Sequence, residues 1–224
     1  MPRRLFVLFF RFFLYLFFRK HLAHILYKIE NKPLEVNSNL PVLLLANHVS
    51  WWDGFLIIFL CEKIMPQRQL LIAMLKSEWS KRTWMSSIGA VPIDPSSPSQ
   101  LLSFFKMLKK KRAENSSFCL AYFYEGSMAN PGEQPSSPKR GTEVVVDQLA
   151  PITVLPVSIT MDFRYRSKTS AFVKVGTPRE VNNSTELSES FTEISHLLKS
   201  THLETTSVQE HMGELQKYDW RPLW

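Results

Sequence analysis

Glycine and cysteine are scarce in this sequence. Its 224 residues include seven glycines and two cysteines, and they contain no glycine-rich stretch and no internal repeat. Without a glycine-rich stretch there is no loop of the kind that wraps a phosphate group in nucleotide-binding folds. Cys61 and Cys119 each lie in an apolar run with no neighbouring Cys or His. We therefore expect two buried thiols, with neither a disulfide framework nor a cysteine-based metal site.

A long apolar run is also missing. Residues 5–18 are almost wholly apolar, but they number 14 and Arg11 interrupts them. A membrane-spanning helix needs about 20 apolar residues. No small-residue cleavage site follows the run, which disfavours a secretory signal. Apolar residues continue at helical spacing through Leu22, Ile25, Leu26 and Ile29, so one helix is expected over residues 5–29.

The positive charge is concentrated at the same end of the chain. Seven Lys and Arg residues against one acidic residue, Glu30, give residues 1–32 a net charge of +6, out of +7 for the whole sequence. An aromatic helix of this charge is typical of monotopic attachment, in which Phe side chains enter the acyl region and arginines meet lipid phosphates. We expect residues 5–29 to attach the protein to the cytoplasmic face of a membrane. The alternative is a core helix that covers the rest of the protein.

The remaining sequence alternates between short apolar runs and amphipathic stretches. This alternation predicts an α/β fold. The expected strands are residues 41–46, 70–75, 90–94, 117–123, 152–159 and 171–175. The expected helices are residues 55–64, 77–87, 98–112, 144–149 and 191–198. The chain is accordingly divided into an N-terminal membrane-associated helical region (1–32), a central domain (33–180) and a polar, partly helical extension (181–224).

The most informative stretch follows the strand expected at residues 41–46. His48 and Asp53 stand five positions apart there, between Asn47 and Gly54. A neutral imidazole can take the proton from an alcohol that attacks a carbonyl group. A carboxylate on its other ring nitrogen fixes the tautomer and stabilises the imidazolium that forms. Taken alone, the pair is a weak signal, and a surface histidine followed by an aspartate that caps the next helix would be the favoured interpretation.

Further motifs follow the His48/Asp53 pair in order along the chain. They are Gly89-Ala90-Val91-Pro92-Ile93-Asp94, Phe123-Tyr124-Glu125-Gly126-Ser127 and Leu155-Pro156-Val157-Ser158-Ile159, with Lys76-Ser77-Glu78-Trp79 between the first motif and the second. Over roughly residues 40–160 this arrangement resembles the glycerolipid acyltransferase family, which includes the lysophosphatidate and glycerol-3-phosphate acyltransferases. The resemblance implies that residues 33–180 form an acyltransferase catalytic domain of phospholipid biosynthesis, in which helices flank a mixed central sheet.

The resemblance also implies roles for individual residues. His48 would be the general base, supported by Asp53, and Pro156 and Val157 would shape the wall of the acyl-donor site. The acceptor would be bound by residues of the third motif and by two lysines, namely Glu125, Gly126, Ser127, Lys76 and Lys139. The donor would be acyl-CoA or acyl carrier protein. No metal, tightly bound cofactor or nucleic acid is implied, and membrane lipids are the expected partners.

Two positions depart from the family pattern. Members that act on phosphate monoesters usually carry arginine where this chain has Pro95 and Met128. Arginine binds phosphate through paired, charge-assisted hydrogen bonds that neither residue can make. The expected acceptor is therefore either a lysophosphatidate-type lipid or a lipid alcohol without a phosphate monoester, such as a glycolipid or a carotenoid glycoside.

Other interpretations stay open at this point. A lipid hydrolase would activate water with the same base, or would form an acyl-enzyme at Ser50. A non-catalytic lipid-binding protein would keep the fold without the reaction. The basic run Lys109-Lys110-Lys111-Arg112 is typical of a solvated helix end, and the alternative is a contact for coenzyme A phosphates or an acidic carrier protein. The Pro-rich residues 130–140 predict a loop that covers bound substrate.

Overall fold

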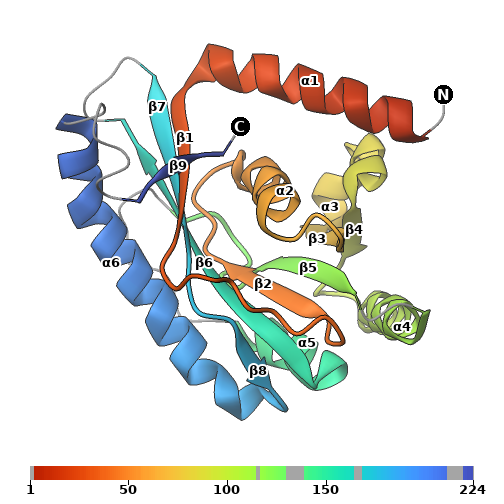
Figure 1. Cartoon of the computed structure of the whole chain (residues 1–224). Helices are drawn as coiled ribbons and strands as arrows, with labels where there is room; N and C mark the ends of the chain where they lie inside the picture. Colours follow the sequence, from red (N-terminus) through yellow and green to blue (C-terminus); the bar gives the residue numbers. More distant parts are fainter. Residues whose placement is uncertain (1–2, 115–116, 130–138, 164–167, 211–218, 224) are drawn as a thin grey trace.

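A computed structural model describes residues 3–114, 117–129, 139–163, 168–210 and 219–223 of the chain (Figure 1). The Pro-rich stretch expected to cover the substrate lies mostly outside these residues. The elements, in chain order, are α1 (Arg3–His21), β1 (Leu22–Ile29), β2 (Val42–Ala46), α2 (Asp53–Ile64), β3 (Gln69–Leu75), α3 (Lys76–Trp79), η1 (Thr83–Ile88), β4 (Ala90–Ile93), α4 (Pro98–Glu114), β5 (Phe118–Phe123), α5 (Arg140–Leu149), β6 (Ile152–Asp162), β7 (Thr169–Val175), β8 (Arg179–Val181), η2 (Ser184–Leu187), α6 (Ser188–Glu210) and β9 (Arg221–Pro222).

The described strands form one mixed sheet, which confirms the expected α/β fold class. Its order is β4-β3-β5-β2-β6-β7-β1-β9, and β8 pairs with β6. The first five strands of this order are parallel to their neighbours. Beyond β6 the directions mix, because β7 is antiparallel to β6 and β9 is antiparallel to β1. The parallel half brings the carboxyl ends of β2, β3, β4, β5 and β6 to one side of the sheet, where open α/β sheets bind ligands.

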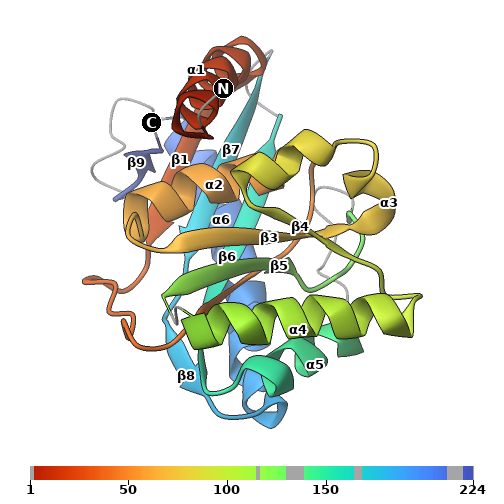
Figure 2. The same cartoon turned by 90° about the vertical axis from the view of Figure 1, so that its right-hand side faces the viewer.

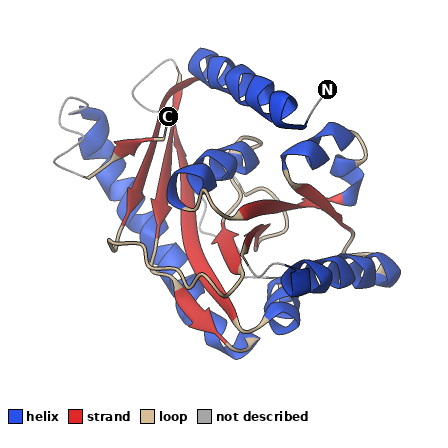
Figure 3. Cartoon of the chain, turned by 45° about the vertical axis from the view of Figure 1, so that its right-hand side comes forward, coloured by secondary structure: helices blue, strands red, loops and turns tan. Residues whose placement is uncertain are grey.

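Helices cover both faces of this sheet (Figure 3). The inner strand β2 is buried on both sides, and its side chains alternate between two cores as the two-residue period of a strand requires. Val42 and Leu44 face the core shared with α1 and α2. Leu43 and Leu45 face the core shared with α4, α5 and α6. Figure 2 shows α1 and α2 on one side of the strands and α4 with α5 on the other.

The expected helix over residues 5–29 is wrong in its second half. The helix α1 ends at His21, and β1 begins at Leu22 and pairs in parallel with β7. The register of this pairing shifts between Leu22 and Ile25. This irregularity interrupts strict alternation, so buried residues fall at positions 22, 25 and 26, a spacing that also suits a helix. The period alone could not separate the two structures, and pairing with residues 169–175 decided the outcome.

The polar C-terminal segment also belongs to the sheet. The helix α6 runs from Ser188 to Glu210, well beyond the predicted residues 191–198, and packs on β6. The strand β9 pairs with β1, and the neighbouring Trp220 and Leu223 are buried. All three predicted segments of the chain therefore contribute to one sheet.

Most of the other predicted elements are confirmed within a few residues. The exception is residues 77–87, which form two short helices, α3 and η1, in place of one. The helix α4 begins at Pro98, as the Ser-Ser-Pro sequence predicts, and it buries Phe104 and Leu108.

Candidate active site

The site is built where β2 ends and α2 begins. After Ala46 the chain turns through residues 47–52, and Asp53 is the first residue of α2. On one side of β2 in the sheet, β5 ends at Phe123 and leads to Glu125 and Gly126. This placement confirms that the His48/Asp53 pair lies at the carboxyl edge of the parallel strands.

Asp53 holds the turn together and orients His48. Its Oδ2 lies 2.8 Å from Nδ1 of His48, 2.7 Å from the Val49 amide nitrogen and 2.9 Å from the Ser50 amide nitrogen. The hydroxyl of Ser50 donates to the other oxygen, Oδ1. Asp53 is fully buried, and its position in the first turn of α2 faces the positive end of the helix dipole. An ionised carboxylate only accepts hydrogen bonds, so Nδ1 of His48 carries the proton and Nε2 is left as a basic acceptor.

Residues at and after the end of β5 contact the ring and the backbone of His48. Its ring stacks on Phe123, with 4.4 Å between the ring centroids and 22° between the planes. Its backbone N–H donates to Oε2 of Glu125 at 2.8 Å, and its carbonyl accepts from the amide of Ala129 at 2.7 Å. The side chain of His48 keeps 24% of its surface exposed. The imidazole is therefore held from behind and open on one side.

Asn47 ties the same turn to the neighbouring strand β6. Its side chain is buried, its Oδ1 accepts from the Ile159 amide at 2.7 Å, and its Nδ2 donates to the Ile159 carbonyl at 2.9 Å. The amide group thus replaces a backbone pairing where β2 has ended. Sequence reasoning assigned no role to Asn47. The available signal was a polar residue that directly follows a buried apolar strand.

A family model describes most of the elements that carry this geometry. The model of the Acyltransferase family matches residues 25–160, which is more than half of the chain and runs from within β1 to within β6. This chain belongs to the glycerolipid acyltransferase family. No curated protein sequence matches it significantly.

Four of the five acceptor residues expected for this acyltransferase lie between β5 and α5, and the fifth, Lys76, follows β3. Glu125 is buried, and one of its oxygens holds the His48 backbone. Gly126 adopts φ +64°, and a Cβ atom there would lie 3.1 Å from Cδ of Lys139, so the lysine side chain lies directly over this glycine. Ser127 is exposed. The structure therefore brings Glu125, Gly126 and Lys139 together beside His48.

Lys76 lies on the far side of β5, where β3 ends. It is the first residue of α3, and its charge acts on Asp94 at the end of β4. Hydrogen bonds from Ser96 and the charge of Lys76 together hold the pKa of Asp94 below its ordinary value. Lys76 thus shares the carboxyl edge with His48 but belongs to a different pair of strands.

The two expected donor residues are buried in β6. Pro156 pairs with Leu45 and Val157 pairs with Ala46, so both lie level with the end of β2. The carbonyl of Pro156 accepts from the Gly176 amide at 2.9 Å. They therefore lie one strand away from His48.

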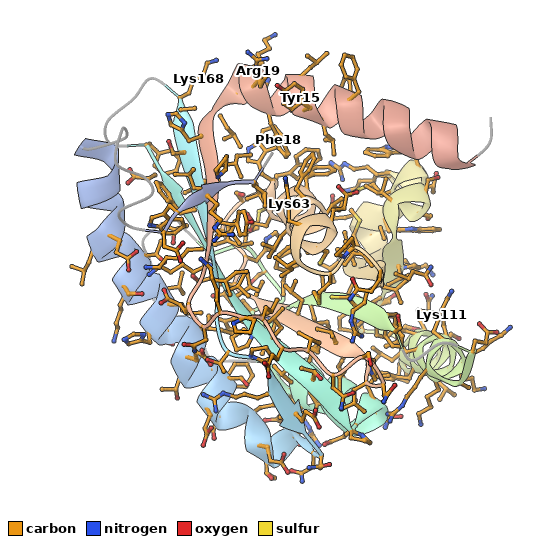
Figure 4. The ribbon with its side chains drawn as sticks, in the orientation of Figure 1. Tyr15, Phe18, Arg19, Lys63, Lys111 and Lys168 are labelled. Atoms are coloured by element: carbon orange, nitrogen blue, oxygen red, sulfur yellow. The ribbon has the colours of Figure 1, made fainter. Side chains whose placement is uncertain are left out.

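Other residues considered in the sequence lie away from this site. Lys111 contacts Gln69 at the start of β3, and Arg112 donates to the Ala150 carbonyl just before β6. The basic run therefore lies at the amino ends of the strands, on the edge opposite His48, and Figure 4 shows Lys111 on α4.

The two cysteines are buried, as expected, with 4.0 Å between their sulfur atoms. The hydrogen bond to Cys119, together with burial, raises the pKa of Cys61, so that thiol stays protonated. Among the described residues, no group of three or more His, Cys, Asp or Glu side chains is placed to hold a metal ion.

Proposed function

We propose that this acyltransferase moves a fatty acyl group from acyl-CoA or acyl carrier protein to a hydroxyl group of a lysophospholipid-type acceptor at a membrane surface. The observation that supports this most directly is the His48/Asp53 pair. Its proton is placed on Nδ1, which leaves Nε2 free to act as a base. The family membership supports acyl transfer as the reaction type.

The proposed step needs no covalent intermediate on the protein. Nε2 of His48 takes the proton of the acceptor hydroxyl while the hydroxyl oxygen forms a bond to the thioester carbon. The bond from that carbon to sulfur then breaks, and the imidazolium returns the proton to the thiolate. Asp53 stabilises the imidazolium while it exists, because the two groups lie 2.8 Å apart and the carboxylate is shielded from water.

The contacts of Ser50 support direct transfer over an acyl-enzyme. Its hydroxyl donates to Oδ1 of Asp53, and its amide donates to Oδ2. A nucleophilic serine would instead direct its hydroxyl proton to the histidine base. Ser50 therefore supports the turn, as its position in the motif predicts.

The proposed acceptor site combines the third-motif residues Glu125, Gly126 and Ser127 with Lys76 and Lys139. Pro156 and Val157 are the proposed donor-side residues. Pro95 and Met128, which stand where phosphate-monoester acyltransferases usually carry arginine, are both exposed. An acceptor without a phosphate monoester is the alternative that this departure favours.

We place the membrane contact on α1, which has two different faces. Leu14 and Phe18 are buried, and Phe18 packs edge-on against Phe55 of α2 at 6.3 Å between centroids. Phe12, Phe13 and Leu16 on the other face are 61%, 50% and 49% exposed. Figure 4 shows Phe18 directed toward α2, while Arg19 lies on the outer side of the helix. None of the described helices combines the length and apolar character that crossing a bilayer requires.

The two faces of α1 allow a direct test of this attachment. Changing Phe12 and Phe13 to Ser removes apolar surface that would enter the acyl region, and should leave the fold stable. Co-sedimentation with anionic phospholipid vesicles should fall several-fold for this variant, whereas its melting temperature should stay near that of the parent protein. Unchanged co-sedimentation would rule out α1 as the attachment surface.

The reaction itself is tested by thiol release from labelled acyl-CoA in detergent. Lysophosphatidate, other lysophospholipids, a glycolipid and no acceptor form separate assays, with acyl carrier protein as the second donor. His48→Ala should lower acceptor-dependent release by several orders of magnitude, since a base and the groups coupled to it act together. His196→Ala, at an exposed position on α6, is the matched control. Release that is equal with and without acceptor would indicate a hydrolase, and release that survives His48→Ala would refute the proposed base.

A further inference from the structure

Arg82 lies next to the catalytic turn although it is remote from that turn in sequence. It belongs to the connection between α3 and η1, and its guanidinium carbon lies 5.8 Å from the ring centroid of Trp51. Trp51 directly follows Ser50, whose amide and hydroxyl both bind Asp53. The guanidinium therefore contacts the turn that holds His48 through the indole ring of Trp51.

Three hydrogen bonds hold Arg82 in place. Its backbone N–H donates to the Trp79 carbonyl and its own carbonyl accepts from the Met85 amide, both at 2.9 Å. Its Nη1 donates to Oε2 of Glu78 at 2.6 Å. Contact with an aromatic face and a carboxylate restricts the rotamers of the side chain, so binding a further group costs less conformational entropy.

Glu78 engages only part of the guanidinium. A guanidinium has five N–H donors, and the contact with Glu78 uses one carboxylate oxygen. The geometry therefore leaves donors available for a second oxyanion. Lys81 makes an instructive contrast, because its Nζ binds the other oxygen of Glu78 at 2.7 Å while its side chain is 64% exposed, against 31% for Arg82.

Further positive charge lies along the same edge of the sheet. Lys76 begins α3 after β3, and Lys139 covers Gly126 after β5. Arg82 adds a fork-shaped donor on the side of the sheet where α2 and Trp51 lie. Two lysines act as point charges, whereas a guanidinium matches the geometry of a phosphate group.

We propose that Arg82, held on the Trp51 ring and against Glu78, binds the phosphate group of the lipid acceptor. This inference rests on the proposed function and names a phosphate contact for its acceptor site. Either a phosphate monoester or a headgroup-bearing diester offers the required oxyanion. The indole of Trp51 and the guanidinium then bring the acceptor alongside the turn that carries His48.

Binding is best measured in the His48→Ala protein, where no turnover occurs to alter the acceptor. Isothermal titration would use three short-chain acceptors with the same acyl chain, namely lysophosphatidate, lysophosphatidylcholine and monoacylglycerol. Arg82→Gln should weaken binding of the phosphate-bearing acceptors by about ten-fold or more, because a charge-assisted hydrogen bond is lost. Monoacylglycerol binding should not change. Lys81→Gln removes the other cation that binds Glu78 and should bind all three acceptors like the parent.

The three acceptors also distinguish the two sources of phosphate. If Arg82→Gln loses affinity for lysophosphatidate alone, Arg82 binds the phosphate monoester. If it loses affinity for both phospholipids, Arg82 binds the phosphate of either class. Arg82→Lys should recover part of the affinity, because it restores the charge without the fork. Such partial recovery argues against a merely structural effect of the substitution.

Several results would overturn the inference. They are an equal loss for monoacylglycerol, no loss for any acceptor, no measurable binding of a phosphate-bearing acceptor, or the same loss in Lys81→Gln. Acyl transfer is measured separately, with the protein that retains His48. If transfer fails while Arg82→Gln still shows the phosphate-selective loss, the proposed function is wrong and Arg82 remains a phosphate ligand. If acyl transfer occurs and Arg82→Gln binds all three acceptors like the parent, only the inference on Arg82 is wrong.

Discussion

Among the described residues, two buried charged clusters can be compared, and they differ in whether a polar side chain stays open to solvent. At the carboxyl edge of the parallel strands, buried Asp53 is surrounded by donors, yet the His48 side chain that it orients is 24% exposed. In the other half of the sheet, Lys174 on β7 is completely buried. Its Nζ lies 2.8 Å from Glu204, 2.9 Å from the Ser200 hydroxyl and 3.0 Å from Glu30. An ammonium group has three N–H donors, so this second cluster is closed.

The closed cluster joins distant parts of the chain. Glu30 follows β1, Lys174 belongs to β7, and Ser200 and Glu204 belong to α6. The indole N–H of Trp220, next to β9, donates to the second oxygen of Glu204 at 3.2 Å. The comparison shows that a buried charged group can either orient a neighbouring side chain or hold separate segments together. A carboxylate saturated by donors of its own turn can orient a histidine, whereas a lysine saturated by partners from two other segments can only hold those segments to its own strand.

The largest expected effect breaks the open cluster. Asp53→Asn should lower the rate of acyl transfer on the order of a thousand-fold or more, because Nδ1 of His48 loses the carboxylate that fixes its tautomer. The measurement is acceptor-dependent thiol release by protein that circular dichroism shows to be folded. Activity within ten-fold of the parent would mean that Asp53 is only a structural support for the turn.

Breaking the closed cluster should affect stability in place of catalysis. Lys174→Met leaves Glu30 and Glu204 without their central cation, and should lower the free energy of unfolding by about 3 kcal/mol. The activity of the protein that remains folded should be close to that of the parent. Urea denaturation provides the free energy, and Lys199→Met, at an exposed position on α6, is the control. An equal change in both variants would show that the buried contacts of Lys174 contribute little.

The closed cluster should also make stability depend on acidity. Burial raises the pKa of Glu204, but the hydrogen bond and charge of Lys174, followed by the charge of Lys28, outweigh burial and lower the pKa overall. A lowered pKa in the folded state means that ionised Glu204 stabilises the fold above its ordinary pKa of 4.5, and that this contribution is lost as the pH falls through the lowered value. Urea denaturation at several pH values below about 4.5 should show a steeper loss for the parent than for Lys174→Met. Parallel curves would contradict this coupling.

The smallest effect is expected when one hydrogen bond is removed from the same cluster. Ser200→Ala deletes the hydroxyl that accepts from Lys174 and leaves both carboxylates in place. Because one partner of a buried group is lost, the free energy of unfolding should fall by about 1 kcal/mol. Thermal and urea unfolding check this value, and Thr192→Ala, an exposed residue on the same helix, serves for comparison. A loss as large as that of Lys174→Met would show that the hydroxyl contributes more than the carboxylates.

Short-range patterns were the ones that sequence reasoning read correctly. The apolar run of β2, the start of α4 at Pro98 and the pairing of His48 with Asp53 all depend on residues within a few positions of one another. Reasoning failed where a remote partner decided the outcome. Residues 22–29 pair with β7 and β9, and the extent of α6 reflects its packing on β6.

The site divides in the same way. The sequence by itself determined the contact between His48 and Asp53 and its place after a buried strand, because a five-residue turn brings both side chains together locally. Only the tertiary structure decided which groups surround them. Glu125 reaches the backbone of His48 from 77 positions away, Asn47 binds Ile159 from 112 positions away, and Arg82 meets Trp51 across two helical elements. Parallel strands must be joined by long crossovers, so neighbours at their carboxyl ends are necessarily distant in sequence.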